Sequence, residues 1–196
     1  MEKNYFVYSY FGENLMKKLL HDEILAQRLT KEQALQSKRH PISLILHNIR
    51  SLYNVGSIFR TSDSALLESL ILCGFTPHPP RDEISKTALG ADETVPWYYE
   101  KSIFDAIEKE KSKGKMIIAV ELTDSGRNYD QLQINDFPLV LILGNEISGI
   151  DDSVLAKCDD AIEIPMYGMK HSLNVSVAAG IVAYESVKIW RNLNNL

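Results

Sequence analysis

The sequence has few cysteines and no long apolar run, and both absences narrow the class of protein. Cys73 and Cys158 are the only cysteines among 196 residues, and their spacing matches neither a metal site nor a redox pair. We therefore expect two reduced thiols and no bound metal. No apolar run approaches the roughly 20 residues that cross a bilayer, and the first 15 residues show no basic stretch followed by an apolar one. These features predict a cytoplasmic protein without a secretory signal or a membrane span.

Acidic residues are absent between Pro41 and Arg60, although the whole chain carries a net charge of −5. Residues 1–60 hold nine Lys or Arg and five Asp or Glu, a balance of +4, whereas residues 61–196 hold twelve and twenty-one, a balance of −9. This division is compatible with a polyanionic partner that meets the N-terminal third. Charge alone does not establish one, because lysine-rich helix faces are usually just solvated.

Alternating helical and strand patterns predict an α/β domain with a mainly parallel sheet flanked by helices. Short apolar runs between turn residues predict strands at residues 42–47, 69–75, 115–122, 138–144 and 160–166. Helical patterns cover residues 13–38, 54–67, 101–113, 150–158 and 172–193, and residues 81–99 read as loop and short helix. The length suits one domain, which we place at residues 41–196 after a helical extension at residues 1–40.

Two polar segments follow predicted strands, at the edge where open parallel sheets bind their ligands. In the first, Asn54 is expected to cap the next helix, and the guanidinium of Arg60 can bind a phosphate through two hydrogen bonds. A capped amphipathic helix with a surface arginine would also explain this segment. In the second, Gly144 and Glu146 directly follow an all-apolar strand, and an ordinary turn would explain them as well.

A third segment leads from Ile164 and Met166 to Ser172 and Asn174, where the last helix is expected to begin. Ser172 alone fits a helix N-cap. We expect His171 to be a surface or supporting histidine rather than a catalytic base. The sequence shows no Ser-His-Asp triad, no metal-ligand cluster and no phosphate-binding glycine loop.

In this order and spacing, NVGSIFRTSDSA, LILGNEISGI and IEIPMYGMKHSLNVSVAAGIVAYE resemble the three signature motifs of the TrmH-like branch of the SPOUT methyltransferases. The connecting segment KTALGADETVPW is also similar, and the resemblance covers about residues 41–190. Two departures are Ser57, where a small apolar residue is commoner, and Asn145, where proline is common. Residues 1–40 match none of the accessory RNA-binding domains found in the family.

The resemblance implies an S-adenosylmethionine-dependent RNA 2′-O-ribose methyltransferase that acts on tRNA or rRNA, with a C-terminal trefoil knot. It implies a homodimer in which the catalytic arginine works beside the donor pocket of the partner. The catalytic residues that it implies are Arg60, Asn54, Glu146, Ser172 and Asn174. The methyl donor would bind among Leu122, Gly144, Ile164, Met166 and Leu173. Backbone hydrogen bonds and apolar walls are what an adenine and a thioether require.

The role of Arg60 and the general function each leave alternatives open. Arg60 can be the base or the electrostatic partner of a phosphate and the developing alkoxide, and we favour the second role because a guanidinium stays protonated at physiological pH. A catalytically silent RNA-binding homologue is the main alternative, and the intact Arg60, Asn54 and Glu146 argue against it. An unrelated nucleotide-binding enzyme should show a phosphate loop, which the sequence lacks.

Two further expectations concern packing. The last helix is apolar on several faces, which predicts a homodimer interface that also includes the helix of Arg60. The apolar residues that carry this expectation are Val175, Ile181, Val182, Val187, Ile189 and Trp190. The N-terminal extension is expected to pack as a helix on the core and to extend a basic surface toward Arg60. The alternative is that its leucines simply cover core surface.

Overall fold

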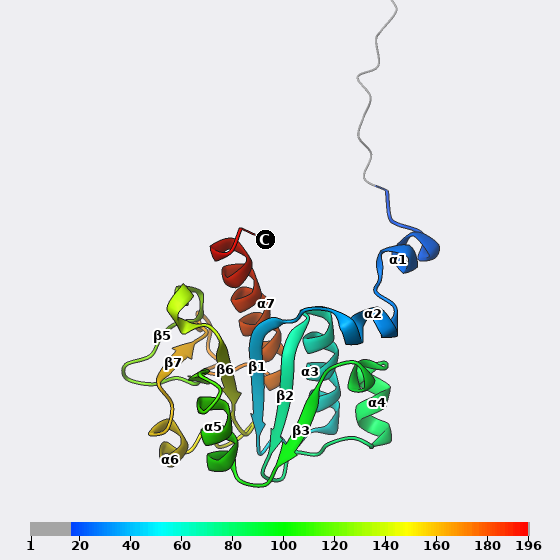
Figure 1. The fold of residues 1–196 in the computed structure, drawn as a ribbon. Coiled ribbons are helices and arrows are strands. Elements are labelled where there is room, and N and C mark those ends of the chain that lie inside the picture. Colours follow the sequence, from blue (N-terminus) through cyan, green and yellow to red (C-terminus); the bar gives the residue numbers. More distant parts are fainter. Residues whose placement is uncertain (1–16, 196) are drawn as a thin grey trace, which may run out of the picture.

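Parallel strands form one sheet at the centre of the folded domain (Figure 1). The computed structural model describes residues 17–195. Within them, seven strands are ordered β3-β2-β1-β6-β4-β7-β5, and every neighbouring pair is parallel. The bounds are β1 His40–His47, β2 Leu67–Cys73, β3 Trp97–Glu100, β4 Met116–Val120, β5 Arg127–Asn128, β6 Leu139–Leu143 and β7 Asp160–Glu163. The expected α/β class with a parallel sheet is confirmed.

Helices cover both faces of the sheet, and the strands divide their apolar side chains between the two sides. On one face, helices α3 (Leu52–Ser64), α4 (Asp82–Ala88) and α7 (Val175–Leu193) belong to a core that includes Leu44 and Leu141. On the other face, α5 (Ile103–Lys111) and α6 (Asp152–Leu155) pack over Ile45 and Ile142. Successive residues of a strand point to opposite faces, so these central strands are buried on both sides and read as continuous apolar runs.

Two strands were not expected, and several predicted elements are shorter in the structure. The segment Trp97–Glu100, read from the sequence as loop or helix, forms the edge strand β3 beside β2. The two-residue strand β5 closes the opposite edge beside β7. The strand expected at residues 160–166 ends at Glu163, and the last helix begins at Val175 rather than at residue 172. An edge strand receives ladder hydrogen bonds from one side only, so it carries a weaker sequence pattern than a central strand.

The N-terminal segment is broken into two short helices, α1 (His21–Gln27) and α2 (Lys31–Gln36), so the prediction of one continuous helix is wrong for the described residues. Its part before residue 17 lies outside them. Thr30 is extended and accepts a hydrogen bond from the Gln33 N–H at 3.2 Å, which starts α2 afresh. Five apolar side chains are 43–61% exposed, namely Leu19, Leu20, Ile24, Leu25 and Leu29. These five side chains therefore do not belong to the core of this chain.

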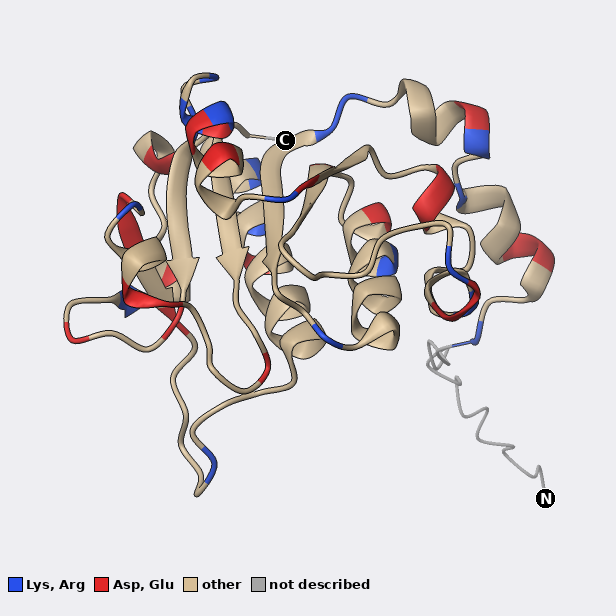
Figure 2. Cartoon of the chain, turned by 90° about the horizontal axis from the view of Figure 1, so that it is seen from below, with Lys and Arg blue, Asp and Glu red and all other residues tan. Residues whose placement is uncertain are grey.

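Only the second of these helices is tied to the domain. Ala34 is its one buried residue, and Arg39 donates hydrogen bonds to the carbonyl oxygens of Ala34, Leu67 and Thr94 at 3.2, 3.0 and 2.7 Å. Lys31 forms an ion pair with Glu93. Within its two helices, α1 carries Asp22 and Glu23 and no Lys or Arg, and α2 begins with Lys31 and Glu32 (Figure 2), so this segment does not present a purely basic face.

Both cysteines are free, as expected, and they are unreactive in this setting. Cys73 is buried and Cys158 is half-buried. Burial raises the pKa of the Cys73 thiol to about 12 and that of Cys158 to about 11. Among the helices of residues 17–195, none combines the length and the hydropathy needed to cross a bilayer.

Replacement of Gly56 by alanine is expected to destabilise the domain by about 2–3 kcal/mol, since overpacking of a tight contact costs about that much. A Cβ atom at Gly56 would lie 1.9 Å from Thr87 Oγ1 and 2.4 Å from the backbone oxygen of Ile84, so α4 would have to move away from α3. Urea unfolding measures the change. The matched control is Gly168→Ala in the loop before α7, where a Cβ meets nothing within 4 Å and φ is not positive. Equal stability of the two variants would contradict the close approach of α3 and α4.

Candidate active site

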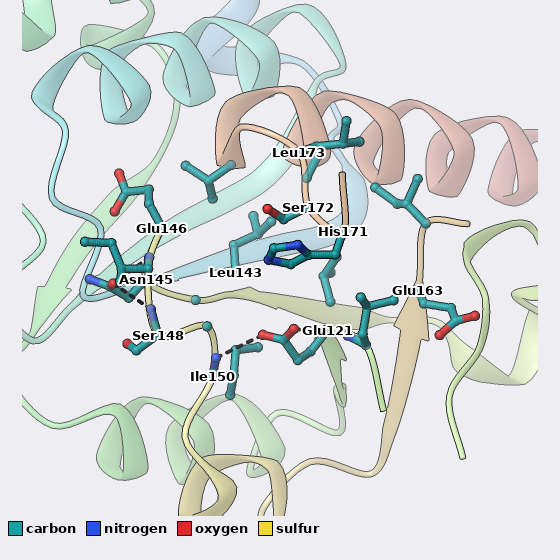
Figure 3. Close-up of a pocket in the computed structure, with 18 of the residues that line it drawn as sticks. Glu121, Leu143, Asn145, Glu146, Ser148, Ile150, Glu163, His171, Ser172 and Leu173 are labelled. Carbon is teal, nitrogen blue, oxygen red and sulfur yellow. Dashed lines mark hydrogen bonds between the residues drawn. The ribbon is translucent and has the colours of Figure 1, made fainter. Parts of the chain in front are cut away.

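A cavity of about 440 Å³ lies beyond the carboxyl ends of β4, β6 and β7 (Figure 3). It is formed by the loops that follow these strands and by the start of α7. All five residues expected to hold the donor line it: Leu122, Gly144, Ile164, Met166 and Leu173. Of the expected catalytic residues, Glu146 and Ser172 line it as well. Residues from three distant segments of the sequence therefore share one pocket.

Backbone groups shape the floor of this pocket because two glycines meet there. A Cβ at Gly144 would lie 2.5 Å from the backbone carbon and oxygen of Gly149, so no side chain fits. Asn145 and Gly149 exchange hydrogen bonds between their backbone N–H and C=O groups, at 3.1 and 3.0 Å. Gly149 also has a φ of 68°, a conformation that favours glycine. Main chain therefore meets main chain at Gly144 and Gly149, and a pair of backbone hydrogen bonds closes the turn between Asn145 and Gly149.

Glu121 braces this turn, and the sequence analysis did not single it out. Its Oε2 accepts a hydrogen bond from the Ile150 N–H at 3.0 Å, and its Oε1 accepts one from the Leu122 N–H at 3.1 Å. Figure 3 shows the carboxylate directed toward Ile150. The only sequence signal was an acid at the end of an apolar strand, which is indistinguishable from a solvated residue until the partner loop is known.

Asn145 also acquires a role that the resemblance did not imply. Its Oδ1 accepts hydrogen bonds from the N–H groups of Ile147 and Ser148 at 2.9 and 3.1 Å, which closes the turn. Its Nδ2 donates to the backbone oxygen of Asn48 at 2.7 Å. A proline at this position would lack both side-chain contacts. Asn145 therefore joins the loop after β6 to the loop after β1.

Glu146 holds the beginning of α3 from outside the helix. Its carboxylate accepts hydrogen bonds from the N–H of Arg50 at 2.9 Å, the N–H of Ser51 at 3.2 Å and Nδ2 of Asn54 at 3.0 Å. A carboxylate at this position also complements the positive end of the helix dipole. Burial alone would raise the pKa of Glu146, but these hydrogen bonds outweigh it and hold the pKa below its ordinary value. Glu146 is therefore ionised at neutral pH.

Asn54 extends the contact to the third segment. Its Oδ1 accepts a hydrogen bond from Nδ2 of Asn174 at 3.1 Å. Glu146, Asn54 and Asn174 form one hydrogen-bonded chain across the three predicted motifs.

Two predictions of helix caps are wrong. The N-cap of α3 is Ser51 instead of Asn54, and the N-cap of α7 is Asn174 instead of Ser172.

Arg60 does not join this group within the chain. It lies six residues after Asn54 on α3, about 9 Å along the helix axis, and its side chain is exposed. It lines a separate groove between α3, α4 and α7. His171, by contrast, lines the same pocket as Ser172. Within residues 17–195, no three His, Cys, Asp or Glu side chains are grouped closely enough to hold a metal ion.

Comparison with known proteins identifies the family to which this chain belongs. The sequence profile of the SpoU rRNA Methylase family matches residues 41–184, and the chain belongs to this family. Family membership implies the C-terminal trefoil knot that the motifs led us to expect. The chain is similar to the YacO protein of Bacillus subtilis, a "Putative TrmH family tRNA/rRNA methyltransferase", with 30% identity over 81% of this chain and 62% of that one.

Other relatives are named for their RNA substrates or donor. The chain is 28% identical to the tRNA (guanosine(18)-2′-O)-methyltransferase of Aquifex aeolicus, over 83% of this chain and 77% of that one. The AdoMet-bound rRNA methyltransferase structure of Sinorhizobium meliloti superposes with a TM-score of 0.71 at 26% identity, over 80% of this chain and 57% of that one. The chain spans about three fifths of the length of its Bacillus relative.

The Glu146→Gln variant is expected to lose about 1 kcal/mol of stability at pH 7, a value reduced from that of a buried charged hydrogen bond because the side chain is exposed. The pKa of Glu146 is lower in the folded than in the unfolded chain, so its ionised form stabilises the fold above the ordinary value of 4.5. That contribution disappears as the pH falls through the folded-state pKa.

Urea unfolding of both proteins between pH 7 and pH 3 measures this difference. The two stabilities should converge in acid. Glu108→Gln, an exposed acid on α5, is the control and should not change the pH profile. A constant difference between Glu146→Gln and the unmodified protein at all pH values would contradict the assignment.

Proposed function

We propose that this protein is an S-adenosylmethionine-dependent RNA methyltransferase that modifies a ribose 2′-hydroxyl of tRNA or rRNA. The observation that carries the proposal is the chain of hydrogen bonds from Glu146 through Asn54 to Asn174, beside a pocket lined by all the expected donor residues. The names of the Bacillus and Aquifex relatives agree with it. No observation favours the alternative of a catalytically silent RNA-binding homologue. The match to the family excludes the alternative of an unrelated nucleotide-binding enzyme.

The pocket suits a cationic donor with an adenosine group. Leu122, Ile164 and Leu173 provide apolar walls, and the paired glycines leave room for backbone contacts. The charged side chains that line the described part of the pocket are all acidic: Glu121, Glu146, Asp152 and Glu163. Negative charge favours a sulfonium over its neutral thioether product. When bound, the donor supplies a methyl group activated by its positive sulfur.

The catalytic residues of the chain would act by position and charge. The ribose oxygen must lie in line with the methyl group and must lose its proton as the new bond forms. We assign Asn54 and Asn174 to the orientation of the sugar and of the donor, and Ser172 to a hydrogen bond at the pocket wall. Arg60 stabilises the developing alkoxide and the adjacent phosphate, because its guanidinium keeps its charge throughout. Phosphate or water then accepts the proton.

A homodimer is also part of the proposal, although the structure changes its basis. Val175, Val182 and Val187 are buried within their own chain, and Trp190 packs on Phe137 at 5.2 Å between ring centroids. Exposed apolar side chains include Val177 and Tyr184 on α7 and Tyr53 on α3, at 50%, 53% and 58%, and Leu193 at the end of α7 is 46% exposed. Tyr53 and Val177 are close in sequence to Asn54 and Asn174, whereas Tyr184 lines the groove that contains Arg60, so a second copy seated on this face would lie next to both.

Two coarser features complete the proposal. A cytoplasmic location would give the enzyme access to tRNA and rRNA. Residues 1–40 would be an extension outside the methyltransferase domain of residues 41–196, since α1 buries no residue; its RNA contacts would come from Lys17, Lys18 and Arg28, which flank α1. Phosphate contacts of such a segment would contribute affinity rather than sequence choice.

Calorimetry with S-adenosylmethionine and S-adenosylhomocysteine should give one site per chain in metal-free buffer containing a chelator. Labelled methyl groups should then appear on the 2′-oxygens of an in-vitro RNA transcript or of RNA from cells that lack the protein. Absence of binding of both ligands to the folded protein would refute the donor assignment. Donor binding without transfer to any RNA would leave a silent homologue.

Arg60→Ala is expected to lower kcat by at least about 100-fold, the typical effect of removing a transition-state donor. The donor Kd should stay within a few-fold, because Arg60 does not line the donor pocket. Asn54→Ala and Asn174→Ala should be intermediate. Single-turnover transfer and donor calorimetry on the same samples separate the two effects. An equal loss of donor affinity in Arg60→Ala would make Arg60 a structural residue.

Val177→Glu is expected to convert a dimer into a monomer, because it places a charge on the exposed apolar surface of α7. Light scattering measures the mass. The matched control is Phe104→Glu on α5, which is 40% exposed on the opposite face of the sheet and should leave the dimer intact. An unmodified protein that is an active monomer would contradict the proposed assembly.

A further inference from the structure

A second cavity, of about 470 Å³, lies between α3, α4 and α7 and is lined by positive charge. Arg60 and Lys86 are its charged residues, and hydroxyl-bearing side chains that include Ser57 and Thr61 form most of the rest. No acid lines it within the described part of the chain, although the protein as a whole is acidic. We call this cavity the cationic groove.

Close packing of two helices creates this groove. Gly56 allows the backbone of α4 to approach α3, as the contact with Ile84 O shows. The Thr87 side chain lies between the two helices, and its hydroxyl donates a hydrogen bond to the backbone oxygen of Ile84 at 3.2 Å. Lys86, its neighbour in the last turn of α4, is thereby placed in the same groove as Arg60. Ser57 and Thr61 lie on the face of α3 that carries Arg60, because residues three and four apart share a helix face.

Neither cation in the groove is neutralised by a partner in residues 17–195. Arg60 and Lys86 take part in none of the ion pairs of these residues, whereas Lys115 contacts both Glu68 and Glu110. Asp82 and Glu83 lie in the first turn of α4 but do not line the groove. Two positive groups in one cavity repel each other unless an anion lies between them. The groove is therefore complementary to an anion that accepts several hydrogen bonds.

We propose that the cationic groove binds a phosphodiester of the substrate RNA, with Lys86 as a second phosphate-binding residue beside Arg60. This inference rests on the proposed function. Arg60 supplies a planar fork, Lys86 a point charge, and Ser57 and Thr61 neutral donors for the remaining oxygens. A ribose 2′-hydroxyl is adjacent to its own 3′ phosphate, so a phosphate held here fixes the position of the reacting oxygen.

The groove and the donor pocket have no lining residue in common. This separation agrees with a dimer in which RNA held by the groove of one chain faces the donor of the other. A second copy of the chain is the competing occupant of the groove, because its acidic surface would also be attracted. RNA is favoured because it offers an anion at every nucleotide and because the groove includes the residue assigned to the reaction.

The test compares Lys86→Ala with Lys86→Arg and with Lys157→Ala, an exposed lysine after α6. Bulk tRNA is the probe, since phosphate contacts do not depend on sequence, and its affinity is measured by fluorescence anisotropy from 50 to 200 mM salt. Lys86→Ala should weaken binding about fivefold to tenfold at low salt and reduce the slope of log K against log salt by about 1. Lys86→Arg and Lys157→Ala should match the unmodified protein.

Methyl transfer provides a second measurement. Lys86→Ala should raise the KM for RNA with little change in kcat, whereas Arg60→Ala lowers kcat, because a phosphate held equally in the ground and transition states affects only binding. If Lys86→Ala still transfers methyl groups but its salt slope is unchanged, phosphate binding in the cationic groove is contradicted. The proposed function would remain intact. A shift to monomer with an unchanged slope would make the groove a subunit contact and would also overturn the proposal. Failure of the unmodified protein to bind donor would instead remove the proposed function, and with it the assignment of the groove to a substrate.

Discussion

The carboxylate of Glu146 is the contact on which the candidate active site depends. It comes from the turn after β6, yet all three of its hydrogen-bond donors belong to the loop after β1 and the start of α3. One charged group therefore satisfies backbone N–H groups that a helix start leaves without intrahelical partners, and it also orients Asn54. Asn54 in turn accepts a hydrogen bond from Asn174 at the start of α7. The turn after β6 and the starts of α3 and α7 are thus linked by one set of hydrogen bonds that begins at this acid.

Glycine positions determine where the two cavities can exist. At Gly144 the facing backbone of Gly149 leaves no space for a side chain, and at Gly56 the backbone of α4 does the same. The first contact gives a pocket with a backbone floor, and the second places Lys86 next to Arg60. In both cases close packing of main chain, rather than a reactive side chain, shapes the site. This is consistent with a reaction that needs alignment more than covalent chemistry.

The charges of the domain are separated in a way that suits two different ligands. The donor pocket is lined by four acids, and the groove by two cations. A cationic donor and an anionic RNA would each meet the opposite sign, and each would be repelled from the other's site. The net charge of −5 does not show this separation, because it sums the charges of the pocket, the groove and the rest of the chain.

The sequence by itself determined the class of fold, five of the seven strands and the segments that meet at the pocket beyond β4, β6 and β7. Central strands buried on both faces leave a continuous apolar run, and the motifs at their ends are local, so both can be read along the chain. The contacts made across the chain could not be read in this way. Glu121 and Asn145 looked like ordinary polar residues until their partner loops were placed beside them. Over residues 17–38 the expected helix is two short helices, and the leucines of α1 are exposed rather than packed on the core. The six-residue spacing of Asn54 and Arg60 already places them about 9 Å apart along a helix, but only the tertiary structure shows that Arg60 shares a groove with Lys86 of α4, because the two helices are distant in sequence.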